Sequence, residues 1–157
     1  MINKEVFELT ENGLQNLKDE LEHLKNVDRP ANIEAIKEAR AQGDLSENAD
    51  YASAKEEQVR IEDRINEIEN ILKNYKIITK DTSNKVTAGK KVNVLYVDSG
   101  MSRSFEIVGT IEADPFKGKI SNNSPLGKAI IGHSAGETCI VTTESNKELK
   151  VKIVTVE

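Results

Sequence analysis

Two stripes of apolar residues, each spaced like the seam of a coiled coil, place the strongest constraint on how this chain can fold. In the first stripe, leucines recur three or four positions apart: Leu14, Leu17, Leu21 and Leu24. The second stripe keeps the same alternation over several turns: Ala54, Gln58, Ile61, Ile65, Ile68, Leu72 and Tyr75. A seam this narrow is what two paired helices bury, so the first half of the chain is predicted to form a coiled coil.

A short polar segment at residues 41–46 separates the two stripes. Gly43 can adopt the left-handed conformation that ends a helix, and Asp44 can cap the helix that follows. So short a connection favours two antiparallel helices of one chain, a hairpin. The heptads do not forbid pairing between chains, so a plain helical bundle or a dimerisation stalk remains the alternative.

Pro30 interrupts the first of these helices. The apolar rhythm resumes out of step at Ile33 and Ile36, so we expect a kink or a register shift near the proline.

The second half has the short alternating patterns of a β-rich domain. Turn-forming residues predict a linker at 77–85, and strands are expected at 91–97, 104–111, 138–142 and 148–156. One short helix is expected where Ser124 can cap, Pro125 can occupy the first position and Gly132 can end it. The predicted fold is α+β, with a coiled-coil arm at 1–76, its tip at 43–50, and an antiparallel sheet domain at 86–157.

Charge is divided unevenly along the chain. The formal net charge is −5, with −7 in residues 1–76 and +2 in residues 77–157. An acidic first half argues against wrapping of duplex DNA by the arm through DNA phosphates. It suits a protein partner with a basic groove, or a place where cations collect.

The sequence predicts a cytoplasmic protein that does not enter a membrane. It has no run of roughly 18 apolar residues, and residues 1–5 lack the apolar core of a signal peptide. Cys139, the one cysteine, lies in an apolar run and is expected to be a buried, reduced thiol.

The tip is where the sequence places its candidate chemistry. His23 and His133 are isolated, and one cysteine gives no zinc-ligand spacing. Asp44 and Glu47 lie three positions apart at a helix start, which would bring their carboxylates together. They form either a capping box, with Asp44 as N-cap and Glu47 at the third position, or a ligand pair for Mg²⁺ that another molecule must complete.

Segments in both halves carry a specific pattern. Around the turn these are Arg29-Pro30, Ala35-Ile36-x-Glu38-Ala39-Arg40, Gly43-Asp44-Leu45-x-Glu47-Asn48-Ala49 and Tyr51-x-x-Ala54. In the second half, Asn123-Ser124-Pro125-Leu126 is followed by Ile131-Gly132. Together they resemble the signature of the GreA/GreB family of bacterial transcript-cleavage factors, over about residues 9–156. The arm lacks a dense Lys/Arg cluster, which favours the less basic of the family's two named types.

The resemblance implies a function inside another enzyme. The arm would enter the secondary channel of RNA polymerase, and a C-terminal domain of FKBP-like fold would dock at the channel rim. Asp44 and Glu47 would share a second, weakly held Mg²⁺ with the polymerase and orient the attacking water. The 3′ end of nascent RNA would be cleaved in backtracked complexes by polymerase itself, so the protein would be no stand-alone enzyme and would hold no cofactor alone.

The resemblance also implies roles for other residues in a protein that is expected to be a monomer. Arg40 and Lys55 would contact the extruded RNA, and Asn48 and Tyr51 would order the tip. Polymerase docking would involve three residues of the second half: Asp114, Ser124 and Pro125.

Three other functions remain open on the sequence. One is a regulator that occupies the polymerase channel without stimulating cleavage, and another is a structural coiled-coil adaptor whose tip acids are only caps. The third, a prolyl isomerase, is disfavoured because residues 77–157 offer few aromatics to line its pocket: Tyr96, Phe105 and Phe116.

Overall fold

The computed structural model describes residues 5–44 and 48–157, which divide into two compact units. Among these residues, the first unit comprises Glu5 and Leu14–Tyr75, and the second comprises Val6–Gly13 and Lys76–Glu157. The sequence placed all of 1–76 in the arm, but Val6–Gly13 groups with the second unit. The physical reason is a strand that the sequence did not reveal: β1 (Phe7–Leu9) pairs with β2 (Tyr75–Ile77).

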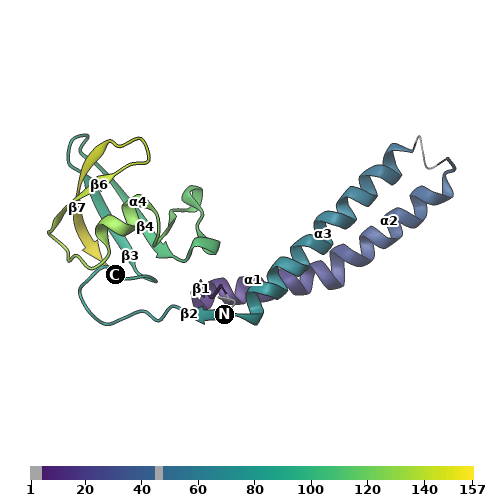
Figure 1. Ribbon diagram of the computed structural model, residues 1–157, viewed down its shortest axis with the longest axis horizontal. Coiled ribbons are helices and arrows are strands. Elements are labelled where there is room, and N and C mark those ends of the chain that lie inside the picture. Colours follow the sequence, from purple (N-terminus) through teal and green to yellow (C-terminus); the bar gives the residue numbers. More distant parts are fainter. Residues whose placement is uncertain (1–4, 45–47) are drawn as a thin grey trace. The chain divides into compact units, whose positions relative to one another are not determined.

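The first unit contains the predicted helical hairpin. Its helical segments are α1 (Glu11–His23), a π-helical turn (Leu24–Asp28), α2 (Arg29–Ala41) and α3 (Ala49–Lys73). Helices α2 and α3 run side by side in opposite directions (Figure 1). With 25 residues, α3 is about 37 Å long at the standard helical rise.

The seam of the hairpin shows why the apolar rhythm changes phase near Pro30. Leu17 and Leu24 are buried and seven residues apart, whereas the next buried position, Asn32, comes eight residues after Leu24. The π-helical turn accommodates the extra residue, because the Arg29 N–H bonds to the Leu24 carbonyl five positions back. The expected disturbance near the proline is therefore a register shift.

The partner helix contributes an isoleucine row to the seam. Its buried residues are Ile61, Ile65, Ile68 and Ile71. The predicted continuation through Leu72 and Tyr75 differs from the structure, since Leu72 is half-buried and α3 ends at Lys73. Tyr75 lies in β2 and is 37% exposed.

Within the described residues, the second unit contains a five-stranded sheet in the order β5-β4-β3-β7-β6. The strands are β3 (Lys91–Tyr96), β4 (Met101–Val108), β5 (Lys119–Ser121), β6 (Thr138–Thr142) and β7 (Glu148–Val156). Neighbours pair antiparallel except β4 and β5, which are parallel. The sheet is thus mixed, because the chain crosses through 3₁₀ turns at Thr110–Glu112 and Pro115–Lys117 before β5 begins.

Helix α4 (Pro125–Ile130) begins as the sequence predicts. The Ser124 hydroxyl accepts the Gly127 N–H at 3.1 Å and donates to the Ser121 carbonyl at 2.7 Å. Ile130 is fully buried in a core with residues from the sheet: Val92, Val94, Ile107, Val151 and Ile153. Cys139 belongs to the same core as a free thiol, and burial raises its pKa.

The segment at 77–85, expected to be a linker, belongs to the second unit. The Ile78 N–H bonds to the Leu9 carbonyl at 2.7 Å. Lys90 is 3% exposed, and its ammonium group donates to Asp81 at 2.8 Å and to the Lys85 carbonyl at 2.8 Å. The segment is therefore held in place by a buried cation.

No helix within residues 5–44 and 48–157 is long and apolar enough to cross a membrane.

Candidate functional site at the end of the arm

Helix α2 ends in a turn that requires glycine. The Gln42 N–H bonds back to the Ala39 carbonyl at 3.3 Å and the Gly43 N–H bonds to the Arg40 carbonyl at 3.4 Å, which closes the helix. Gly43 then has φ of 116°, a value that side chains with a Cβ rarely adopt. Asp44 follows on the connection and is exposed to solvent.

The next helix is capped by Asn48, not by Asp44 as the sequence suggested. The Asn48 side-chain oxygen accepts the Tyr51 N–H at 3.1 Å, and its amide nitrogen donates to the Ala39 carbonyl at 2.7 Å. One side chain therefore satisfies the start of α3 and binds it to the end of α2. The capping-box interpretation of Asp44 is wrong, because α3 begins only after Asn48. Glu47, its expected partner, lies outside the described residues.

Tyr51 is in contact with Arg40, the residue to which the resemblance assigns RNA binding. The Arg40 guanidinium lies 5.9 Å from the centroid of the Tyr51 ring, within the range of a cation–π interaction. Residues Arg40, Asn48 and Tyr51 thus form one connected cluster behind the tip.

One groove between the helices, which we call the basic groove, contains both predicted RNA contacts. It is lined by Ile33, Ile36, Lys37, Arg40, Lys55 and Gln58. The Lys55 ammonium donates to Gln58 at 2.7 Å, which holds it along α3. Arg40 on one helix and Lys55 on the other are therefore brought together.

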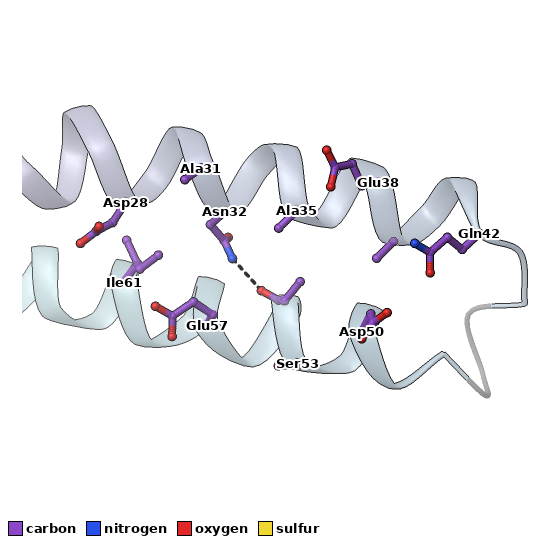
Figure 2. Close-up of a pocket in the computed structure, with 12 residues that line it drawn as sticks. Asp28, Ala31, Asn32, Ala35, Glu38, Gln42, Asp50, Ser53, Glu57 and Ile61 are labelled. Atoms are coloured by element: carbon purple, nitrogen blue, oxygen red, sulfur yellow. Dashed lines mark hydrogen bonds between the residues drawn. The ribbon is translucent and has the colours of Figure 1, made fainter.

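A second groove between the same helices, which we call the acidic groove, was not foreseen from the sequence (Figure 2). Its lining includes the alanines Ala31, Ala35, Ala39 and Ala54 and the acids Asp28, Glu38, Asp50 and Glu57. Buried Asn32 crosses its floor and donates to the Ala54 carbonyl at 2.9 Å. The sequence signal that could have revealed it is the alanine at every fourth position of α2.

The described residues do not form a complete metal site. Within 5–44 and 48–157, no group of three or more His, Cys, Asp or Glu side chains could hold a metal ion. Asp44 on the connection can offer one carboxylate. A Mg²⁺ ion, which requires six ligands, would need most of them from water or another molecule.

The residues expected to dock on polymerase lie at two places in the second unit. Asp114 caps the 3₁₀ turn before β5 by accepting the Phe116 N–H at 3.2 Å. Ser124 and Pro125 line a mainly apolar pocket with other side chains of the unit: Tyr96, Ile120, Leu126, Val141 and Leu149. The Phe116 side chain is fully exposed on its turn.

Comparisons with known proteins agree over both units. Residues 7–77 match the N-terminal family model described as "Transcription elongation factor", and residues 80–157 match the C-terminal model, "Transcription elongation factor, GreA/GreB". Proteins named transcription elongation factor GreA are 55% identical in Acholeplasma laidlawii and 48% identical in Bacillus subtilis, with 98% of each chain covered. The crystal structure of GreA factor homolog 1 of Thermus thermophilus is 26% identical over 98% of this chain and 99% of that one, with a TM-score of 0.44. The chain belongs to the GreA/GreB family of transcription elongation factors.

Proposed function

We propose that this elongation factor inserts its arm into the secondary channel of RNA polymerase in the cytoplasm and stimulates cleavage of the RNA 3′ end in backtracked complexes. The observation that carries the proposal is the exposed Asp44 on the connection between α2 and α3, just beyond a helix end that Asn48 holds closed. Family membership supports the same function. Removal of the extruded RNA segment would let elongation resume.

Asp44 and Glu47 are the residues that we assign to the reaction. Their carboxylates would contribute oxygen ligands to a Mg²⁺ ion shared with polymerase and would orient the attacking water. When bound, that ion supplies Lewis-acid stabilisation of the oxygens at the cleaved phosphodiester. In this proposal polymerase supplies the remaining ligands and most of the reaction site, and the protein acts as a stimulator of polymerase and not as a stand-alone enzyme.

The remaining assignments come from the family resemblance, and the positions of the side chains support them. Arg40 and Lys55, together in the basic groove, would lie along the phosphates of the extruded RNA. Asn48 and Tyr51 would keep the tip ordered through the bonds described above. The second unit would dock a monomer of the protein at the channel rim through Asp114, Ser124 and Pro125.

The test is RNA cleavage in stalled elongation complexes. Asp44→Asn removes the charge but keeps the shape, and it leaves the α3 cap intact because Asn48 supplies that cap. We expect Asp44→Asn and Glu47→Gln to abolish stimulated shortening of 5′-labelled RNA in Mg²⁺, while binding to polymerase is kept. Asp63→Asn, on an exposed position of α3, is the matched control and should cleave normally.

Two results would count against the proposal. Full cleavage by both tip variants would show that the tip acids have no part in the reaction. Binding of the unmodified protein to stalled complexes without any faster cleavage would instead support the non-catalytic channel regulator.

A further inference from the structure

The two grooves of the hairpin carry opposite charge. Among the described residues, the acidic groove is lined by four carboxylates and no cation, and the basic groove by three cations and no carboxylate. On α2, Ala35 and Lys37 illustrate the separation, because positions two apart on a helix point about 200° away from each other. The arm therefore has a negative side and a positive side.

Two of the groove carboxylates already have partners in the arm. Glu57 forms an ion pair with Arg60 at 2.6 Å, and Asp28 lies 3.3 Å from the imidazole of His23. Their charge is partly compensated within the chain.

The other two carboxylates, Glu38 and Asp50, lie toward the tip end of the groove (Figure 2). Both are exposed, and among residues 5–44 and 48–157 neither side-chain carboxylate takes part in a hydrogen bond or an ion pair. Two exposed negative charges on facing helices can therefore receive a partner without displacing an existing one.

The groove floor suits the stem of a long basic side chain. Ala31, Ala35 and Ala39 follow each other at one-turn intervals, and their small side chains leave room between the helices. Lysine and arginine bury an aliphatic stem on apolar surface while the charged head contacts an acid. Nucleic acid is disfavoured here, since its phosphates would meet uncompensated carboxylates.

We propose that the acidic groove docks a lysine- or arginine-bearing segment of RNA polymerase, which turns the basic groove toward the RNA. The inference deepens the proposed function and rests on it. Charge complementarity of this kind selects one orientation of a bound element because the reverse orientation places like charges together. Glu38 and Asp50 are the residues that set this orientation.

The experiment compares two double variants of the full-length protein with equal charge change. Glu38→Gln with Asp50→Asn removes the two unpaired groove charges, whereas Glu34→Gln with Glu56→Gln removes two exposed charges that line neither groove. Affinity for stalled elongation complexes is measured by titration with a fluorescently labelled protein at low and high salt. We expect the groove variant to bind about tenfold more weakly at low salt, with a smaller difference at high salt, and the control to bind normally.

A single substitution separates the inference from helix stability. Asp50 is in the first turn of α3, where a negative charge also stabilises the helix. Glu38 is in α2 beyond its first turn, and Gln has nearly the same helix propensity as Glu. Glu38→Gln alone should therefore weaken binding severalfold while the circular dichroism spectrum and melting temperature stay unchanged.

Several results would overturn the inference. Normal binding by the groove variant, or equal weakening by the control, would show that the groove has no specific occupant on polymerase. A wild-type dimer in light scattering that the groove variant dissociates would assign the groove to a second copy. If the unmodified protein does not bind polymerase, the proposed function fails as well, whereas failure of the groove alone leaves wild-type binding and Asp44-dependent cleavage intact.

Discussion

Glu112 accepts two hydrogen bonds from Thr10, one from the backbone N–H at 2.6 Å and one from the hydroxyl at 2.5 Å. The Thr10 hydroxyl in turn accepts the Gly13 N–H at 3.0 Å. Thr10 immediately precedes α1, so a carboxylate more than a hundred positions away in the sequence completes the start of this helix. A Cβ on residue 13 would lie 2.1 Å from the Glu112 carboxyl carbon, so a side chain there would displace the carboxylate from its present position.

Disruption of this contact is expected to destabilise the protein. Glu112→Gln replaces one acceptor oxygen with an amide that faces a donor, and Gly13→Ala displaces the carboxylate and breaks both bonds. Each should lower the free energy of unfolding by about 1–3 kcal/mol, measured by urea unfolding. The effects should be less than additive in the double variant, because both remove the same contact. Glu148→Gln, at an exposed position of β7, should change stability by less than about 0.5 kcal/mol.

Two substitutions of Asn48 can separate the effect of its bond to Tyr51 from that of its bond to Ala39. Asn48→Ala loses both the α3 cap and the bond to Ala39, and should cost about 0.5–2 kcal/mol. Asn48→Asp keeps the cap acceptor but cannot donate to the Ala39 carbonyl. We expect faster hydrogen exchange at the Tyr51 amide in the alanine variant and near-normal exchange there in the aspartate variant. Equal exchange in all three proteins would contradict the capping role.

The contact between Asp81 and Lys90 predicts a dependence of stability on acidity. The hydrogen bond from Lys90 lowers the pKa of Asp81 from its ordinary 3.8 to about 2. Because the folded state binds this proton less readily than the unfolded chain, the stabilisation is complete above about pH 4 and is lost as pH falls through about 2. Asp81→Asn should therefore be less stable than the parent at pH 6, and the difference should vanish toward pH 2. The control Asp98→Asn, in an exposed turn, should show no such convergence.

Gly127 in α4 is predicted to resist substitution. A glycine-to-alanine change within a helix ordinarily stabilises by about 1 kcal/mol. Here the added Cβ would lie 2.3 Å from the Ser121 backbone carbonyl oxygen, which cannot move without disturbing β5. Overpacking typically costs about 1–3 kcal/mol, so we expect net destabilisation in thermal unfolding. Lys128→Ala on the exposed side of the same helix should be nearly neutral, and a stabilised Gly127→Ala protein would refute the steric argument.

Regular patterns were the part of the fold that the sequence could predict. Strands β6 and β7 have the expected limits, because buried and exposed side chains alternate along β6 and along β7 as far as Ile153. The start of α4 followed from Ser124 and Pro125, which act through local bonds. Strands β1, β2 and β5 have three residues each, too few for a period to show, and their pairing depends on distant parts of the chain.

The candidate site was predictable in composition but less so in geometry. Both Asp44 and Asn48 are good cap residues, but only the Asn48 amide can also donate to the Ala39 carbonyl of the facing helix as the hairpin closes. The approach of Asp44 to Glu47 stays a prediction, since Glu47 lies outside the described residues. The acidic groove forms only where α2 and α3 pair, so the alanine spacing on α2 indicates one wall of the groove but not the residues that face it from α3.

The number of residues in the π-helical turn at Leu24–Asp28 decides which side chains of α2 reach the seam with α3. Deletion of one residue there would permit an uninterrupted α-helix but would rotate everything beyond it by about 100°. Ile36 and Ala39 would leave the interface with α3, and charged neighbours would enter it. This one additional residue thus determines which face of α2 packs against α3.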